Sequence, residues 1–267
     1  GIPTVSLFGA EATAVMDAVD AIEDALRSTA VPDPEASADR IDGTTDLDTA
    51  VDDVDVIVDS RQADLGTKRD RLAALEEHID PATVIAARTG EDGVTALAVA
   101  LEAPERVVGL DLVASEEPGV VEVVRADHTD DETIETIREF IEMLGWRPVV
   151  VYDTPGALSQ RLQLALEVEA MRAVQTDVAA PPDVDAVMEQ GFGIEEGPLK
   201  SADRAGLDRR LETLERLAAD LGERFEPPAV LRSKVAEGSL GQQTDEGFRV
   251  WENDHPSEDA AESFEGR

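Results

Sequence analysis

The sequence has no cysteine among its 267 residues, and it is poor in lysine and in aromatic side chains. Without a thiol, the chain forms no disulfide and uses no cysteine nucleophile. Only three of its 23 basic residues are lysine, and aromatic residues make up 3%. No apolar run approaches the roughly 20 residues that a membrane-spanning helix needs, and no signal-peptide pattern is present. These absences predict a cytoplasmic protein without membrane contact.

Acidic side chains dominate what is present, with 60 Asp and Glu residues and a formal net charge of −37. Such a charge repels itself in dilute buffer, whereas at about 1 M salt the Debye length is roughly 3 Å and the repulsion is screened. The acidic residues are scattered along the whole chain, which favours a halophilic protein over a block-like acidic surface for a partner. Nucleic acid is excluded as a partner because phosphate binding needs a basic patch.

The first half of the chain alternates β-branched runs with stretches of helical periodicity, which predicts an α/β domain with a parallel sheet. The predicted strands are Val5–Phe8, Val54–Val58, Thr83–Ala86, Val107–Leu110, Val120–Val124 and Pro148–Tyr152. The β signal stops after Pro155-Gly156, and two helical seams follow at 158–174 and 207–221. We therefore expect a sheet domain at 1–152, a helical domain at 153–250 and an acidic mobile tail at 251–267.

Several sequence segments, called phrases below, resemble segments of the 3-hydroxyacyl-CoA dehydrogenase family. They occur in the same order as in the family and cover nearly the whole chain. The phrases are Arg40-Ile41-Asp42-Gly43-Thr44-Thr45-Asp46-Leu47, Pro104-Glu105-Arg106-Val107-Val108-Gly109, Val121-Glu122-Val123-Val124, Asp153-Thr154-Pro155-Gly156 with Arg161, Gly191-Phe192-Gly193, Gly197-Pro198-Leu199, Ala202-Asp203 with Gly206-Leu207-Asp208, Gly222-Glu223-Arg224-Phe225 with Pro227-Pro228, and Gly241 with Gly247-Phe248. The resemblance implies a Rossmann-type parallel sheet domain followed by an all-helical domain that pairs two subunits. It also implies NAD as cofactor and an acyl-CoA substrate.

The family's dinucleotide site opens with a glycine-rich turn, and no Gly-x-Gly-x-x-Gly sequence occurs in this chain. Gly9 follows a strand that resembles the family's second one, so the first βα unit is apparently absent. Either the first βα unit was removed from this chain, or the protein lacks it. The simplest interpretation of Gly9 itself is a turn glycine. On the nicotinamide side, Ala63 stands where the family has Glu, while Lys68 keeps the family's Lys. Lys68 is read either as a cofactor-binding residue or, more simply, as a surface residue at the start of a helix.

The family's catalytic dyad is a histidine that accepts the substrate proton and a buried glutamate that orients it. Asp111 occupies the position of the histidine, whereas Glu122 keeps that of the glutamate. In short peptides Asp is about 2.6 pKa units weaker as a base than His. Two neighbouring carboxyls raise one of their pKa values, so a proton-sharing pair stays open as an alternative. A structural hydrogen bond to the backbone or to Arg125 is the competing interpretation of Glu122.

Two further positions of the implied site differ from the family. Gly90 stands in place of the substrate-facing serine, with the charged Arg88 and Glu91 beside it, and Gln160 stands in place of an asparagine. No histidine offers a replacement, because His78, His128 and His255 lie in polar contexts typical of the surface, and no metal-binding motif is present.

Two hypotheses from different classes follow. The first is an NAD-dependent 3-hydroxyacyl-CoA dehydrogenase. The second is a family-derived protein that keeps the fold and the dimer surface for binding or assembly without catalysis. The functional positions differ while the structural phrases are kept, so we expect an inactive or altered member. The missing glycine turn argues against NAD binding by the chain.

Overall fold

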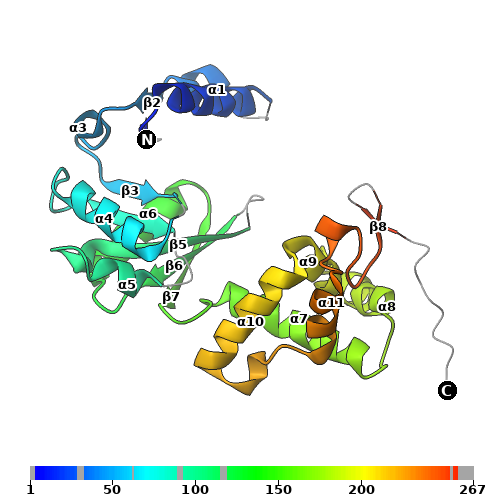
Figure 1. Ribbon diagram of the computed structural model, residues 1–267. Coiled ribbons are helices and arrows are strands. Elements are labelled where there is room, and N and C mark those ends of the chain that lie inside the picture. The colour runs from blue at the N-terminus through cyan, green and yellow to red at the C-terminus, as the bar shows by residue number, and fades with distance from the viewer. Residues whose placement is uncertain are drawn as a thin grey trace. The chain divides into compact units, whose positions relative to one another are not determined.

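Two sheets form the first unit of the chain, Gly1–Thr154, in the computed structural model (Figure 1). The structure describes residues 4–28, 33–61, 63–88, 93–114, 119–252 and 255–257. The smaller sheet pairs β1 with β2 in parallel, and the larger one has the order β3-β4-β5-β6-β7. The strands are β1 (Val5–Phe8), β2 (Ile41–Thr44), β3 (Val56–Asp59), β4 (Val84–Arg88), β5 (Val107–Ala114), β6 (Val120–Arg125) and β7 (Arg147–Tyr152). We call Gly1–Thr154 the sheet unit.

Six helices connect these strands, namely α1 (Ala12–Ser28), α2 (Pro34–Ala38), α3 (Leu47–Ala50), α4 (Leu65–Glu76), α5 (Val94–Ala98) and α6 (Asp131–Met143). The sequence of α6 is amphipathic, and its apolar residues Ile134, Ile137 and Ile141 pack on one face of the larger sheet. Asp130 caps its first turn by accepting a 2.7 Å hydrogen bond from the Thr133 amide. The helix is followed by Gly145, whose φ of +79° suits glycine, as the sequence predicts.

One pair in the larger sheet departs from the expectation of an all-parallel arrangement. β6 runs antiparallel to β5, whereas β3, β4 and β5 are mutually parallel and β6 is parallel to β7. Only residues 115–119 separate β5 from β6, and a parallel return needs a crossover of about a dozen residues or more. The connection is therefore too short for anything but an antiparallel pair.

Helices build the second unit, Pro155–Arg267, which we call the helical unit. Its helices are α7 (Ser159–Gln175), α8 (Pro181–Ala186), α9 (Pro198–Ala205), α10 (Leu207–Leu221) and α11 (Ala229–Glu237), with a π-helical turn at Val187–Gly191 and a short strand pair of β8 (Trp251–Glu252) and β9 (His255–Pro256). The seam predicted on α10 supplies Leu207 and Leu214 to the core. On α7 the predicted Leu162 is exposed, and the core receives Leu164 and Val168 from a neighbouring stripe of the helix. The α/β class with a helical second part is confirmed.

Two local expectations differ from the structure. The strand β2 lies in the stretch Arg40–Leu47, where no strand was predicted. Asp42 and Gly43 interrupt the run of apolar residues that would indicate a strand. Trp251, placed in the tail by the sequence, is buried, and its Nε1 donates a 3.1 Å hydrogen bond to Asp203. The rest of the expected tail lies largely outside the described residues. None of the described helices is both long and apolar enough to cross a membrane.

Candidate functional site

Asp111 and Glu122 lie directly opposite each other on β5 and β6. Opposite residues of an antiparallel pair have Cβ atoms about 4.5–5.5 Å apart, so the two side chains leave the sheet side by side on one face. Glu122 is 2% exposed, and Asp111 is half-buried. Both residues take part in interactions within the fold. The structure therefore brings together the two positions that the sequence assigns to a catalytic dyad.

Strand alternation fixes the face of the sheet on which the pair lies. Val121 and Val123 pack in the core beneath α6, so the intervening Glu122 points to the opposite face. Asp111 alternates in the same way with Leu110, which packs against that core. The pair thus belongs to the face away from α6.

The helix α5 is fixed to the sheet near the ends of β6 and β7 by Asp153. Its carboxylate accepts a 2.7 Å hydrogen bond from the Thr95 amide in the first turn of α5. Gly93, just before the helix, has a φ of +78°, and a Cβ there would lie 2.8 Å from the Asp153 carboxylate. Thr95 in turn accepts a 3.2 Å bond from the Asp127 amide. The sequence phrase Asp153-Thr154-Pro155-Gly156 signalled a domain entry but gave no hint of this cap.

Lys68 is not the surface residue that the simpler interpretation expected. It is 7% exposed, in the first half of α4, and its Nζ donates a long 3.4 Å hydrogen bond to the Arg88 carbonyl at the end of β4. Among the described residues this is the one hydrogen bond of its ammonium group. Ala63, half-buried just ahead of α4, offers no carboxylate for it. The result is a buried cation with a weak native partner at the carboxyl end of a parallel strand.

The remaining predicted positions fall in different parts of the structure. Gly90 and Glu91 lie outside the described residues, and Arg88 is exposed. Gln160 belongs to the helical unit, in the first turn of α7, where its Oε1 lies 3.3 Å from the position of a Cβ at Gly156. Gly156 has a φ of +76°, and this turn leads the chain into α7.

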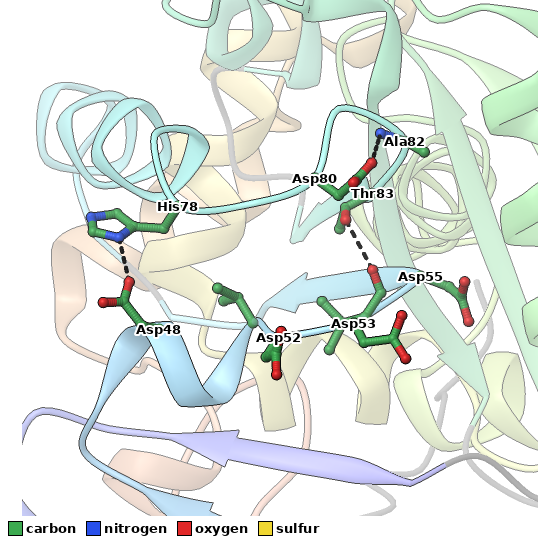
Figure 2. Close-up of a pocket in the computed structure, with 10 residues that line it drawn as sticks. Asp48, Asp52, Asp53, Asp55, His78, Asp80, Ala82 and Thr83 are labelled. Carbon is green, nitrogen blue, oxygen red and sulfur yellow. Dashed lines mark hydrogen bonds and ion pairs between the residues drawn. The ribbon is translucent and has the colours of Figure 1, made fainter.

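An acidic pocket of about 640 Å³ lies elsewhere in the sheet unit (Figure 2). Asp48, Asp52, Asp53, Asp55 and Asp80 line it, together with His78. His78 Nδ1 lies 2.7 Å from Asp48 Oδ1, and the Asp80 carboxylate accepts from the Ala82 amide. No three acidic or histidine side chains in the described part of the chain converge well enough to hold a metal ion. His78, His128 and His255 are all exposed, as predicted.

The turn after β1 contains the single glycine Gly9, where an added Cβ would lie 2.7 Å from Val15 Cγ2, so this glycine serves strand–helix packing. Glu11 then precedes α1. Because β1 resembles the family's second strand, this turn is not the position of the family's glycine-rich turn.

Sequence reasoning missed a buried ionisable cluster in the core of the helical unit. Glu167 of α7 is almost fully buried, and burial raises its pKa to about 7 against the opposing effect of Arg210. Arg210 Nη2 donates to Glu167 Oε1 at 3.0 Å, and Ser201 Oγ lies 3.3 Å from the same oxygen. A signal existed, because Glu167 shares the apolar stripe of Leu164 and Met171, and Arg210 shares that of Leu207 and Leu214.

Comparison with known families matches both units. The family model described as "3-hydroxyacyl-CoA dehydrogenase, NAD binding domain" matches residues 3–154, and "3-hydroxyacyl-CoA dehydrogenase, C-terminal domain" matches residues 156–251. A probable 3-hydroxybutyryl-CoA dehydrogenase of Deinococcus radiodurans is 34% identical over 218 residues, which cover 80% of this chain and 78% of that protein. One from Bacillus subtilis is 32% identical over 200 residues, covering 74% and 70%.

Solved structures agree with the sequence comparison. The crystal structure of (S)-3-hydroxybutyryl-CoA dehydrogenase from Ralstonia eutropha superposes with a TM-score of 0.83 at 25% identity, covering 93% of this chain and 90% of that one. A 3-hydroxybutyryl-CoA dehydrogenase from Escherichia coli gives a TM-score of 0.85 at 28% identity, covering 95% of this chain and 56% of that one.

Proposed function

This chain belongs to the 3-hydroxyacyl-CoA dehydrogenase family, and from that premise we propose that it is an altered member without NAD-dependent dehydrogenase activity. The proposed ancestral reaction is the transfer of hydride from a 3-hydroxyacyl-CoA to NAD, with a protein base accepting the hydroxyl proton. The proposal rests on what occupies the position of that base.

The observation that carries it is the carboxyl pair of Asp111 and Glu122. A neutral imidazole accepts a proton near pH 7 and keeps a second ring nitrogen for an orienting carboxylate. Asp111 has no second ring nitrogen, and in short peptides Asp is about 2.6 pKa units weaker as a base than His. The pair on β5 and β6 therefore lacks an imidazole that could accept the hydroxyl proton while Glu122 orients it.

The residues available to bind NAD also argue against hydride transfer by this chain. When bound, NAD supplies the hydride acceptor. Lys68 is suited to a negatively charged ligand, because among the described residues its buried ammonium has one hydrogen bond, a long one to the Arg88 carbonyl. One buried cation does not replace the backbone amides of a glycine-rich turn.

The test is NADH oxidation with acetoacetyl-CoA in molar KCl between pH 5 and 9. We expect no rate above that of the buffer. Asp111→His is expected to stay inactive as well, because Gly90 and Gln160 remain as they are. A clear rate that disappears in Glu122→Gln, but persists in the exposed-site control Glu105→Gln, would show that the altered pair works and would overturn the proposal.

We also propose that the chain forms a homodimer through the helical unit, as the likeness to its family implies. In support, this unit exposes large apolar side chains, among them Leu162, Val187 and Phe192. Exposed apolar area of this kind often marks a protein interface. Light scattering in molar KCl is expected to give about twice the chain mass of 28.6 kDa. A single species at 28.6 kDa would contradict it.

A second candidate function is acyl-CoA binding or assembly without catalysis. This candidate is favoured because the dyad position Asp111 differs from the family's histidine, whereas both units keep a buried apolar core. Calorimetric titration with acetoacetyl-CoA in the absence of NADH separates the candidates. Heat of binding without turnover supports a binding protein, whereas no heat leaves assembly as the retained role.

A further inference from the structure

The three lysines of the chain differ in how firmly their ammonium groups are held. Lys200 Nζ lies 2.8 Å from Glu189 Oε1, and Lys234 Nζ donates a 2.6 Å hydrogen bond to the Gly247 carbonyl. Lys68 is 7% exposed, and its one hydrogen bond among the described residues is a long one of 3.4 Å. An ammonium group has three donors. Lys68 is therefore a buried amine that the described part of the chain holds only weakly.

The side chain of Lys68 lies on the same face of the larger sheet as the carboxyl pair. The crossovers through α4 and α5 advance in one direction, from β3 to β4 to β5, and right-handed crossovers of this kind place their helices on one face. α6 covers the other face, and Leu72 of α4 and Leu97 of α5 are buried outside its core. Because Asp111 and Glu122 point away from α6, they share the face that α4 and α5 cover.

The register of the sheet also brings these groups close together along the strands. Lys68 Nζ lies 3.4 Å from the Arg88 carbonyl, and Arg88 is the partner of Leu110 on the neighbouring strand β5. Asp111 follows Leu110 and lies opposite Glu122 on β6. Neighbouring strands are about 4.8 Å apart and successive residues rise about 3.3 Å, so the backbones of Arg88 and Asp111 are about 6 Å apart. A ligand of a few carbon atoms on this face is long enough to contact the amine and a carboxyl together.

An amine beside two carboxyl groups is the set of groups that condensation with a carbonyl needs. A lysine amine attacks the carbon of a ketone as a nucleophile. A neighbouring acid gives a proton to the carbonyl oxygen, and a neighbouring base takes one from the nitrogen. Hydride transfer, by contrast, makes no use of a nucleophilic amine. The arrangement of Lys68, Asp111 and Glu122 therefore suits the formation of a bond to a carbonyl carbon.

We propose that Lys68 binds a 3-ketoacyl compound covalently, as a reversible imine between its Nζ and the ketone carbon. This inference rests on the proposed function, because the ketone is the counterpart of the ancestral 3-hydroxyacyl substrate and NAD does not occupy Lys68. The bond between nitrogen and carbon forms, the bond between carbon and oxygen breaks, and the oxygen leaves as water with the two hydrogens of the neutral amine. Asp111 and Glu122 give one proton to the oxygen and take one from the nitrogen, so the pair ends as it began. No oxidant or reductant takes part.

The test is trapping with cyanoborohydride, which reduces an imine to a stable amine and leaves a ketone intact near neutral pH. The full chain is incubated in molar KCl with acetoacetyl-CoA, without NADH, and the adduct is located by mass mapping of peptides. We expect modification of Lys68 to exceed that of Lys200 and Lys234 by about tenfold or more, because oriented groups react faster than groups in solution. Butyryl-CoA has no 3-ketone and is expected to give no adduct.

Variants separate the nucleophile from the groups that transfer protons. Lys68→Met is expected to abolish the adduct, whereas Lys200→Arg is expected to keep it. Asp111→Asn is expected to slow adduct formation by about tenfold or more, because one carboxyl of the pair remains. Glu105→Gln, at an exposed position, is the control and is expected to leave the rate unchanged. Far-UV circular dichroism checks the folding of each variant, and Glu122→Gln repeats the test from β6.

The outcomes distinguish this inference from the proposed function. Equal modification of all three lysines would show that no amine is special. An equal adduct from butyryl-CoA would show acylation by the thioester in place of an imine. Adduct formation at the full rate in both Asp111→Asn and Glu122→Gln would overturn the role of the pair. NADH oxidation is measured in parallel. A clear rate would refute the proposed function, whereas no rate and no adduct would refute the imine alone.

Discussion

Buried charges of the helical unit and Lys68 of the sheet unit differ in how well their hydrogen bonds are formed. In the helical unit Asp203 and Asp185 are fully buried, and each carboxylate accepts several hydrogen bonds. In the sheet unit the buried Lys68 has a single long bond among the described residues. The buried carboxylates of the helical unit thus have strong partners within the fold, whereas Lys68 has a weak one among the described residues.

Salt provides the largest expected effect and tests whether the two units are unequally stable. At a net charge of −37, self-repulsion grows as the Debye length rises from roughly 3 Å in molar salt to about 10 Å at 0.1 M. We expect the sheet unit to lose about 10 °C or more in melting temperature over this range and to unfold before the helical unit. Each unit has its own tryptophan, Trp146 and Trp251, which allows them to be followed separately.

Fluorescence melts of Trp251→Phe report the sheet unit through Trp146, and melts of Trp146→Phe report the helical unit through Trp251. Far-UV circular dichroism on the unsubstituted chain checks that neither substitution changes the order of unfolding. A single coincident transition at every KCl concentration would contradict unequal stability, and equal midpoints in low and molar KCl would contradict salt dependence altogether.

Asp203 gives the largest expected effect of a single substitution. Its carboxylate accepts from the Phe248 amide at 2.8 Å, the Arg249 amide at 2.8 Å and Trp251 Nε1 at 3.1 Å. Asp203→Ala leaves these three donors buried without their acceptor, and we expect the helical unit to lose about 3–5 kcal/mol of unfolding free energy. Urea unfolding followed by Trp251 fluorescence measures the loss. The exposed Asp220→Ala is the control and is expected to change stability by less than about 0.5 kcal/mol.

Glu167 is expected to make the stability of the helical unit depend on pH. Burial raises the pKa of its carboxyl to about 7 from the ordinary value of 4.5, because Arg210 only partly compensates. Arg210 Nε approaches Glu167 Oε2 to 2.9 Å, but neither atom has hydrogen-bond geometry. With a raised folded pKa, the contribution of the protonated carboxyl is complete below pH 4.5 and is lost as pH rises through about 7.

The measurement compares the unsubstituted chain with Glu167→Gln, which cannot titrate. The difference in unfolding free energy between the two is expected to fall by about 2–3 kcal/mol from pH 4.5 to 7.5. Other carboxyls titrate equally in both proteins and cancel in the difference. Glu169→Gln, on the exposed side of the same helix, is expected to show no such trend. A pH-independent difference for Glu167→Gln would show that the carboxyl stays ionised beside Arg210.

Periodicity in the sequence located most of the fold but only part of the site. The amphipathic pattern of α6 and the seams of α7 and α10 predict helices because their apolar residues recur at 3.6-residue spacing. The pair of Asp111 and Glu122 was predictable only through family likeness, because register across an antiparallel pair depends on the connection between the strands. The burial of Lys68 escaped prediction because a lysine near a helix start is ordinarily solvated. Asp153 escaped too, because its cap joins residues 58 positions apart.

The smallest expected effect concerns Lys68, and its matched partner within the same unit is Arg106. Both residues are 7% exposed, but their hydrogen bonds differ. Arg106 donates to the Asp80 carbonyl at 2.7 Å and to Glu76 at 3.0 Å, whereas Lys68 reaches the Arg88 carbonyl at 3.4 Å. Burying a cation costs solvation free energy that only good hydrogen bonds return.

Lys68→Met keeps the aliphatic stem and removes the charge, so we expect the unfolding free energy, measured in urea, to change by less than about 1 kcal/mol in either direction. Arg106→Met is expected to lose about 3 kcal/mol, because it leaves the half-buried Glu76 carboxylate without its cation. Equal losses in the two variants would mean that Lys68 is held as firmly as Arg106. Its role would then be structural, and it would not be available to bind an anionic ligand.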